Sequence, residues 1–526
     1  MDRNRQAPEL DELIDLLGDW SSGEGPLYRR LTDVLGRAVR SGDLRTGDRL
    51  PSERRLADAL SVSRATIVAA FDVLRGSGLV ETRRGSGTQV SEGAAGHRVP
   101  ADGRVRGGQA TAVVQRLITQ PPDLISLGQA AEAGGPDLPQ ALLHLVREDL
   151  PGLIREVGYH PAGLPALRAA IAAHHTVHGL PTVPEQVVVT TGATQAVALS
   201  AQLYLGRGST ALVESPGWPG CLDVLRAAGS QLVGVPLDSD GVRIDRLATA
   251  LAEHRPALLY LMPTYHNPTG TLMSAGRRRR VAELAAEHGV PVLEDSAHAA
   301  ALAPGQTPPP IAANAVPGTV LTVGSLTKAV WGGLRIGWIR APQDTVARLA
   351  RLKALNDLGS PILDQALAAR LLPALPALAP ERARILREQL ATMTRLLAEQ
   401  LPDWRWREPQ GGSVLWIRLP SGTDARVYAQ VALRHGAEVI PGATTDTTGA
   451  HDNYIRLPYS FAPETAAALV SRLSAAWTAL SRSSSRRGSA QRHGLSTAPP
   501  WLAPCTQRPH TTPPPAVPQR ASSGGE

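Results

Sequence analysis

The sequence predicts a multidomain protein with a small α+β domain that contains a helix-turn-helix, a large α/β domain and a disordered C-terminal tail. Three observations predict it. Residues 25–90 combine short helical patterns with a closing hairpin pattern, residues 123–480 alternate apolar strand-like runs with helical patterns, and residues 481–526 are rich in Ser, Pro and Arg. Such alternation favours a mainly parallel sheet with helices on both faces. Residues 91–122, rich in Gly, Ala and Arg, are predicted to link the two domains.

The composition argues against several classes of protein. Of the 526 residues, 43% are apolar and 19% are charged, so the chain can bury a sizeable core. Two cysteines, Cys221 and Cys505, are too few for a disulfide framework or a Cys-rich metal site, which indicates a reducing compartment. The N-terminal segment has no apolar signal core, and no apolar run approaches about 18 residues. We therefore expect a cytoplasmic protein with no metal centre and no membrane segment.

The N-terminal domain begins with an amphipathic helix from Leu27 to about Ser41. Ser52 is placed to cap a short second helix, and Ser63 is placed to cap a third after a three-residue break. Two short helices joined by so tight a turn make a helix-turn-helix, whose second helix is suited to a major groove. The spacing therefore predicts a DNA-binding fold.

A basic hairpin pattern follows over residues 79–90, and its tip consists of Arg83, Arg84, Gly85, Ser86 and Gly87. This tip is flexible enough to reach a minor groove or phosphates. The net charge of the whole chain, +7, is modest, but residues 27–90 carry twelve arginines against seven acidic residues. Because such a surface attracts phosphate, we expect double-stranded DNA as the partner.

The N-terminal domain resembles the winged helix-turn-helix of the GntR family. The resemblance rests on two patterns, L-P-S-E-R-x-L-A-x-x-L-x-V-S-R-x-T and L-x-x-x-G-L-V-x-x-x-x-G-S-G-T-x-V. It implies that Arg54 and Arg64 contact bases or phosphates and that Thr66 helps to position the recognition helix. It also implies that Gly85 and Gly87 shape the wing.

Six apolar runs in the large domain are predicted to be strands, and polar residues gather where they end. The runs are residues 186–191, 210–213, 232–235, 257–261, 291–293 and 319–323. Ligands bind at the carboxyl ends of parallel strands. Asp295, Asn267 and Lys328 each follow a different run, while Ala193 and Thr194 open a helix whose N–H groups make an anion site.

Lysine usage singles out Lys328. Only two of the 54 basic residues are lysines, Lys328 and Lys353. Lysine can lose its proton and form a Schiff base, whereas arginine stays protonated. An arginine-rich chain is therefore expected to keep lysine where a primary amine matters. Lys353, in a helical pattern, is interpreted as a surface residue, and Lys328 as the reactive amine.

These residues match what pyridoxal phosphate needs around its ring. Lys328 would form the Schiff base, and Asp295 would keep the pyridine nitrogen protonated so that the ring accepts electrons. Asn267 would donate to the phenolic oxygen of the ring, and Trp218 would stack on its face.

Basic and hydroxyl side chains match the charged parts of such a ligand. Ser325 and Arg335, together with the N–H groups of Ala193 and Thr194, would hold the phosphate. Arg456 would bind the carboxylate of an amino-acid-like ligand.

The large domain resembles the fold-type I aminotransferases over residues 123–480. The motifs GYHPAGLPALR, TTGATQA, ESPGW, YHNPTG, LED, GSLTK and GLRIGW occur in the order shown by that family. The resemblance implies that Tyr159 reaches the phosphate of a neighbouring subunit, and hence a homodimer. One departure is that Ala297 and His298 stand where the family places a tyrosine that donates to the ring oxygen. Either His298 replaces that donor or Asn267 acts alone.

Joined in one chain, the two domains resemble the MocR subfamily of bacterial transcription regulators. This implies a DNA-binding regulator whose large domain senses pyridoxal phosphate, alone or with an amino-acid-like amine. One alternative is an active aminotransferase with an accessory DNA-binding domain. Another is a repressor whose degenerate body serves only dimerisation, against which the intact GSLTK and LED segments argue.

Overall fold

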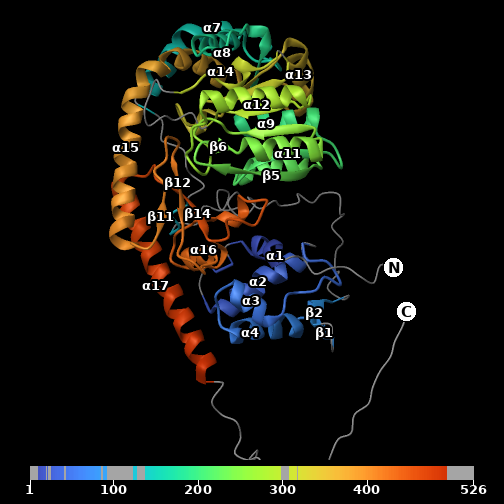
Figure 1. Cartoon of the computed structure of the whole chain (residues 1–526), viewed down its shortest axis with the longest axis vertical. Helices are drawn as coiled ribbons and strands as arrows, with labels where there is room; N and C mark the ends of the chain where they lie inside the picture. The colour runs from blue at the N-terminus through green and yellow to red at the C-terminus, as the bar shows by residue number, and fades with distance from the viewer. Residues whose placement is uncertain are drawn as a thin grey trace, which may run out of the picture. The chain divides into compact units, whose positions relative to one another are not determined.

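The computed structural model describes residues 10–18, 20–21, 25–40, 43–83, 87–91, 123–126, 135, 137–297, 307–316 and 318–493 (Figure 1). Contacts divide the chain into two units, Met1–Ala479 and Leu480–Glu526. The first unit contains two parts that we call the head, residues 10–91, and the body, residues 123–479.

The head consists of helices and one antiparallel hairpin. Its elements are α1 (Leu10–Leu17), α2 (Leu27–Arg40), α3 (Glu53–Ala59), α4 (Arg64–Gly76), β1 (Val80–Arg83) and β2 (Gly87–Val90). The two strands pair with Val80 opposite Val90. Both predicted caps are confirmed, because Ser52 Oγ accepts from the Arg55 N–H at 3.3 Å and Ser63 Oγ accepts from the Thr66 N–H at 3.1 Å.

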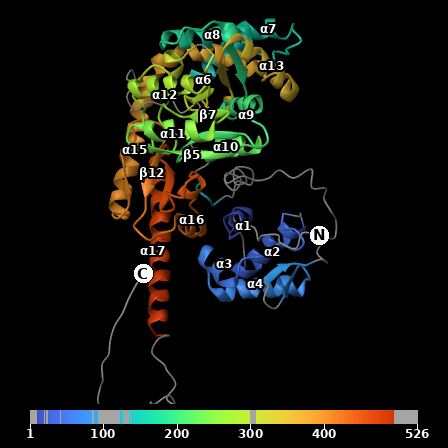
Figure 2. The ribbon, with the colours of Figure 1, turned by 45° about the vertical axis from the view of Figure 1, so that its right-hand side comes forward.

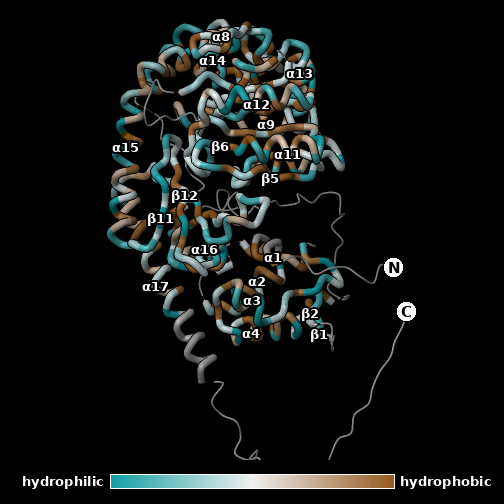
Figure 3. The backbone as a smooth tube through the Cα atoms, viewed as in Figure 1, coloured by the Kyte–Doolittle hydropathy of each residue, from teal (hydrophilic) through white to brown (hydrophobic). Residues whose placement is uncertain are grey.

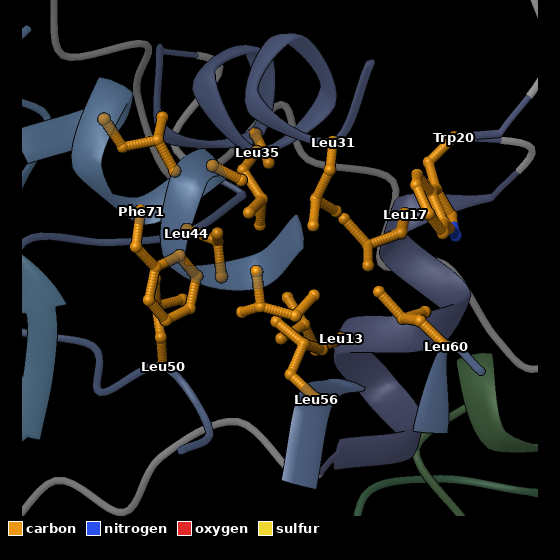
Figure 4. Close-up of a cluster of buried hydrophobic side chains, with 14 of the residues drawn as sticks. Leu13, Leu17, Trp20, Leu31, Leu35, Leu44, Leu50, Leu56, Leu60 and Phe71 are labelled. Atoms are coloured by element: carbon orange, nitrogen blue, oxygen red, sulfur yellow. The ribbon is translucent and has the colours of Figure 1, made fainter. Parts of the chain in front are cut away.

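Helix α1 belongs to the core of the head, although it precedes residues 25–90, over which the domain was predicted. Leu13, Leu17 and Trp20 are buried in the same cluster as Leu31 and Leu60 (Figure 4). The leucines recur at helical spacing, so one face of α1 is apolar. The charge of the segment concealed this face.

The body is built around an eight-stranded sheet with the order β3-β10-β9-β8-β7-β4-β5-β6. The strands are β3 (Val187–Thr190), β4 (Thr210–Ser215), β5 (Gln231–Asp238), β6 (Gly241–Val242), β7 (Leu258–Leu261), β8 (Val292–Asp295), β9 (Val320–Ser325) and β10 (Gly337–Arg340). All six predicted runs are strands, and the pairs from β9 through β8, β7 and β4 to β5 are parallel. Strand β10 was not predicted, and it pairs antiparallel with both β3 and β9.

Helices cover both faces of this sheet, as the alternation predicted (Figure 2). They are α8 (Pro165–Val177), α9 (Ala193–Tyr204), α10 (Pro219–Ala227), α11 (Ile244–His254), α12 (Ala275–Glu287), α13 (Gln343–Asp357) and α14 (Ile362–Leu371). Neighbouring residues of one strand enter different cores: Val213 packs with residues of α9 and α10, whereas Leu212 packs with residues of α11 and α12. Hydrophobic residues accordingly follow the strands (Figure 3).

A smaller four-stranded sheet completes the body, in the order β11-β12-β14-β13. Its elements and the remaining helices are β11 (Arg405–Trp406), β12 (Val414–Arg418), β13 (Ile440–Pro441), β14 (Tyr454–Pro458), α6 (Asp137–His144), α7 (Leu150–Leu153), α15 (Leu375–Gln400), α16 (Ala425–Arg434) and α17 (Pro463–His493), with short 3-10 or π turns η3 (Leu145–Asp149), η4 (Pro184–Gln186), η5 (Ile311–Asn314), η6 (Gly332–Leu334), η7 (Leu372–Ala374) and η8 (Gly442–Thr444).

Two long helices bear on the predictions about membranes and the tail. The stretch Ile362–Gln400 is long and apolar enough to span a membrane, but its apolar half packs Leu367, Leu371 and Leu372 into the core of the body. Helix α17 continues to His493, so the segment from 481, predicted to be disordered, begins as helix. The rest of that tail, residues 494–526, lies outside the described residues.

Candidate functional site

The register of the large sheet brings the predicted strand-end residues to one edge. Ser325 lies opposite Gly337, and Gly337 lies opposite Thr190, so the ends of β9 and β3 flank the start of β10. Asp295 ends β8 beside Val323 of β9. Because β3, β7, β8, β9 and β4 all end at this edge, the loops that follow them share one site.

An anion cradle forms where β3 meets α9. Gly192 caps α9 with φ +79°, and a Cβ placed on it would lie 2.6 Å from Arg335 Nη2. The guanidinium of Arg335 therefore lies against the turn that leads to Ala193 and Thr194, the first residues of α9. Unpaired N–H groups and the dipole at a helix N-terminus favour a bound anion, and Arg335 adds a positive charge.

Arg335 itself has a left-handed backbone, with φ +52°. This conformation is uncommon for a residue with a side chain and is found disproportionately at functional positions. The side chain is exposed, and its Nη2 reaches the Thr191 carbonyl only at 3.4 Å. The arginine is thus fixed in place by its backbone while its charge remains available to a ligand.

Lys328 lies in the turn that follows β9. Ser325 Oγ accepts from the Thr327 N–H at 3.2 Å and contacts Thr327 Oγ1 at 3.0 Å, which caps this turn. The N–H of Val330 then bonds to the Leu326 carbonyl at 2.8 Å. Lys328 lies between these bonds and is half-buried, in the turn at the carboxyl edge of the sheet.

Asp295 is buried at the end of β8 and holds a partner that the sequence did not reveal. The Tyr260 hydroxyl donates to Asp295 Oδ2 at 2.8 Å, and the Ala297 N–H donates to Oδ1 at 2.9 Å. Burial raises the pKa of the Asp295 carboxyl, and these two bonds oppose part of the rise. The sequence offered one signal for this role of Tyr260, because Tyr260 is the one polar side chain in a strand that is otherwise leucine.

Arg456, Asn267 and Trp218 meet where the small sheet faces the large one. Arg456, on β14, donates through Nε to Asn267 Oδ1 at 2.9 Å, which leaves the amide nitrogen as the donor end of Asn267. The Arg456 guanidinium lies 4.8 Å from the centre of the Trp218 ring. The structure thus brings together three predicted ligand-binding residues from distant parts of the sequence.

The electrostatics of Arg456 indicate an anionic ligand. Burial lowers the pKa of its guanidinium to about 9, and the charge of Glu438 opposes part of the fall. Within the described residues, Arg456 Nη1 is buried without a hydrogen-bond partner. Such a group costs free energy unless a ligand satisfies it.

Arg278 shows what a buried arginine with a structural role looks like in the same body. Its Nε donates to the Met273 carbonyl at 3.0 Å, and its Nη2 donates to the Pro263 carbonyl and to Thr264 Oγ1. Its Nη1 lies 3.6 Å from Glu294. Arg278 is therefore satisfied within the chain, in contrast to Arg456.

Two other predicted ligand residues have different outcomes. Tyr159 is 66% exposed and contacts none of the cradle residues in the described bonds. His298, the candidate substitute for the missing tyrosine, lies outside the described residues.

Lys353, interpreted as a surface residue, is fully buried. That interpretation was wrong because Gln195, which pairs with the Lys353 ammonium, lies 158 positions away and no local pattern reveals it.

Predicted DNA-contacting residues of the head lie at the start of α4, which is the second helix of the helix-turn-helix. Arg64 is the first residue of α4, is 72% exposed and contacts Glu53 at 2.9 Å. Arg54 is exposed in the first turn of α3, while Thr66 contacts Ser63 at 2.9 Å as part of the cap of α4. The N-terminal residues of a recognition helix are those that reach base edges.

The wing is described only in part. Gly87, at the start of β2, has φ +79°, which suits the turn it was predicted to shape. The backbone of Arg83 ends β1. Arg84 and Gly85, together with the side chain of Arg83, lie outside what the structure describes.

Two family descriptions match the chain. Bacterial regulatory proteins of the gntR family match residues 27–90, and aminotransferases of class I and II match residues 154–473. The first match covers the helix-turn-helix and wing, and the second covers both sheets of the body.

Several known proteins are similar over much of the chain. An uncharacterized HTH-type transcriptional regulator of Bacillus subtilis, YisV, is 32% identical over 83% of this chain and 93% of its own. The probable rhizopine catabolism regulatory protein MocR of Rhizobium meliloti is 29% identical over 60% of this chain and 66% of its own. The structure of LysN, an alpha-aminoadipate aminotransferase of Thermus thermophilus complexed with N-(5'-phosphopyridoxyl)-L-leucine, is 28% identical, with a TM-score of 0.63, over 72% of this chain and 96% of its own.

Proposed function

The chain belongs to the GntR-family transcription regulators of the MocR type, which carry an aminotransferase class I and II domain, and on this premise we propose that its body binds pyridoxal phosphate and senses an amino-acid-like amine. The observation that supports this most directly is that Arg456 Nη1 is buried with no hydrogen-bond partner in the part of the chain that the structure describes.

The residues at the edge of the sheet fit pyridoxal phosphate. The cradle of Gly192, Ala193, Thr194 and Arg335, with Ser325, would hold the phosphate, and Asp295 would pair with the pyridine nitrogen. Trp218 and Asn267 would bind the ring. When bound, the cofactor supplies an aldehyde that condenses with a primary amine and a ring that accepts electron density. The amine of this chain would be that of Lys328.

The effector would be an amine that carries a carboxylate. Arg456 lies against Trp218 and Asn267, so its guanidinium would orient a carboxylate next to the ring. A bidentate bond would satisfy Arg456 Nη1, which has no hydrogen-bond partner among the described residues. Amino acids and their analogues are the ligand class that offers both groups.

We further propose that the protein is a cytoplasmic homodimer, and the dimer would account for the exposed apolar residues near Tyr159. Val157 is 84% exposed, Ile154 is 72% exposed, and Tyr159 itself is 66% exposed. Apolar residues gathered on one exposed segment mark interaction surfaces. A second copy of the chain would cover them and receive Tyr159 at its phosphate site.

Signals from the body can reach the head through direct contacts. Arg434, on α16, donates to the carbonyls of Leu60 at 2.8 Å and Ser61 at 3.2 Å, in the turn of the helix-turn-helix. One helical turn earlier, Gln430 accepts from the Trp20 indole N–H at 3.2 Å. A ligand changes DNA binding only if it favours one arrangement of such contacts over another.

The proposal is tested on the full chain with an operator selected from random DNA. Its affinity is expected to change when pyridoxal phosphate and an amino acid are added together, in a gel shift at fixed salt. Multiple turnover with an amino-acid and keto-acid pair, without any change in DNA affinity, would instead support the aminotransferase alternative.

Arg64→Ala is expected to cost about 1–3 kcal/mol of operator binding if Arg64 reads a base. The matched control is Arg75→Ala, because Arg75 lies at the other end of α4 and pairs with Asp72 much as Arg64 pairs with Glu53. Both variants are compared by gel-shift titration. Equal affinities would rule out base reading by Arg64.

Arg335→Ala is expected to weaken the retention of pyridoxal phosphate by about tenfold or more, because it removes a charge-assisted bond to the phosphate. DNA binding should stay unchanged. The measurement is equilibrium dialysis followed by absorbance, with Arg384→Ala as control, since Arg384 is an exposed arginine of α15 paired with Glu381. Parallel loss of both activities would indicate misfolding rather than a role in binding.

A further inference from the structure

Lys353, the second of the two lysines, is buried beneath the anion cradle. Its side chain is fully buried in α13. Its ammonium lies 2.9 Å from Gln195 Oε1 and 2.7 Å from Asp357 Oδ2. A charged group so placed is costly to bury unless it is paired, and here it is paired by a carboxylate and an amide.

Gln195 connects this lysine to the backbone of the cradle. Its Oε1, which accepts from Lys353, also accepts from the Thr191 N–H at 2.8 Å. Its Nε2 donates to Asp357 Oδ2 at 2.8 Å. Both polar ends of the Gln195 side chain are therefore fixed, and Thr191, directly before the cap residue Gly192, is fixed with them.

The end of α13 holds the cradle at a second point. Thr191 Oγ1 lies 2.9 Å from Ser360 Oγ, and Asp357 Oδ1 accepts from the Gly359 N–H at 3.0 Å. Residues 353–360 thus hold the Thr191 side chain directly, through Ser360, and the Thr191 N–H indirectly, through Gln195. A shift of this segment would shift the turn into α9.

The chemistry of lysine explains why this position differs from the 52 arginines. An ammonium is a compact point charge with three donors, whereas a guanidinium is a larger planar fork. Two acceptors within 2.9 Å, in a position without exposed surface, suit the compact group. Burial lowers the pKa of Lys353, and the hydrogen bond and charge of Asp357 oppose part of that fall.

We propose that Lys353 is a positioning residue that holds Gln195, and through it the Thr191–Gly192 turn, in the geometry that binds the phosphate of the cofactor. The inference rests on the proposed function, because the cradle must receive a phosphate for this positioning to matter. It assigns a role to each lysine of the chain: Lys328 supplies the reactive amine and Lys353 supports the anion site.

The test compares pyridoxal phosphate with pyridoxal, which lacks the phosphate. Lys353→Met, similar in length but uncharged, is expected to weaken the binding of pyridoxal phosphate by about tenfold while leaving pyridoxal binding nearly unchanged. Lys353→Arg should not restore binding, because the charge is kept but the shape is not. Absorbance titration of the full chain gives the dissociation constants of both vitamers, and the ratio of the pyridoxal constant to the pyridoxal phosphate constant measures what the phosphate contributes. Gel shifts report whether the head is intact.

Gln195→Met is the second variant and keeps the test usable if Lys353→Met does not fold. Gln195→Met should also weaken the binding of pyridoxal phosphate relative to that of pyridoxal. The double variant should lose little more affinity for pyridoxal phosphate than either single variant, because both residues act through one network. An unchanged ratio in folded Lys353→Met, or in Gln195→Met if the former does not fold, would overturn the inference alone. A wild-type chain that binds neither vitamer would overturn the proposed function and this inference with it.

Discussion

Lys328→Ala is expected to abolish the visible absorbance that pyridoxal phosphate gives the purified protein. The covalent attachment needs a primary amine at the carboxyl edge of the sheet, and Lys328 is placed there in the turn capped by Ser325. Borohydride reduction of the wild-type chain, followed by peptide mapping, should find the label on Lys328. The effect is the largest predicted, because no other residue type can replace the amine.

The scarcity of lysine makes this experiment decisive. Lys353 is the one other lysine in the sequence, and its ammonium is buried against Gln195 and Asp357. It therefore serves as an internal control for nonspecific labelling. A folded wild-type chain that carries no label, or carries it on Lys353, would contradict the assignment. Lys328→Ala should still bind its operator as the wild type does.

Arg456→Gln is expected to weaken the binding of carboxylated amines by about 30-fold or more, since removing one member of a buried charge pair costs about 2–5 kcal/mol. Amines of the same skeleton without the carboxylate should bind Arg456→Gln and the wild type alike. Absorbance titrations of the cofactor-loaded protein measure both. The glutamine keeps a polar group beside Asn267 but lacks the charge.

The same substitution has a second expected effect, of opposite sign, on the ligand-free protein. Because burial lowers the pKa of Arg456 to about 9, its charged form is disfavoured in the folded state, and this cost is present at every pH below that value. Removing the charge should therefore leave the melting temperature unchanged or raise it. Arg395→Gln, an exposed arginine paired with Glu399, is the matched control. A uniform loss for amines with and without carboxylate would exclude a carboxylate-binding role.

Local features of the fold could be predicted from the sequence because short-range chemistry determines them. The caps at Ser52 and Ser63 each depend on a bond to a residue three positions later. The six predicted strands were apparent as apolar runs, and their ends located Asp295, Asn267 and Lys328. Sheet topology then brought these residues to one edge, as the general rule for parallel sheets states.

Features that depend on distant partners could not be predicted. Arg456 and Asn267 are 189 positions apart, and Lys353 and Gln195 are 158 apart, so no local pattern links them. The burial of Lys353 shows the limit most clearly, because a lysine in an amphipathic pattern is usually at the surface. Strand β10 was missed because its sequence, GWIR, contains a glycine and an arginine and does not form an apolar run.

The bonds from α16 to the helix-turn-helix have a practical consequence for the study of this protein in pieces. A fragment that stopped at Ser91 would leave the Trp20 indole and the carbonyls of Leu60 and Ser61 without Gln430 and Arg434. Water would replace these partners, and the turn before the recognition helix would be free to relax. Operator affinities measured on such a fragment would describe a DNA-binding domain without its contacts to α16, not the intact regulator.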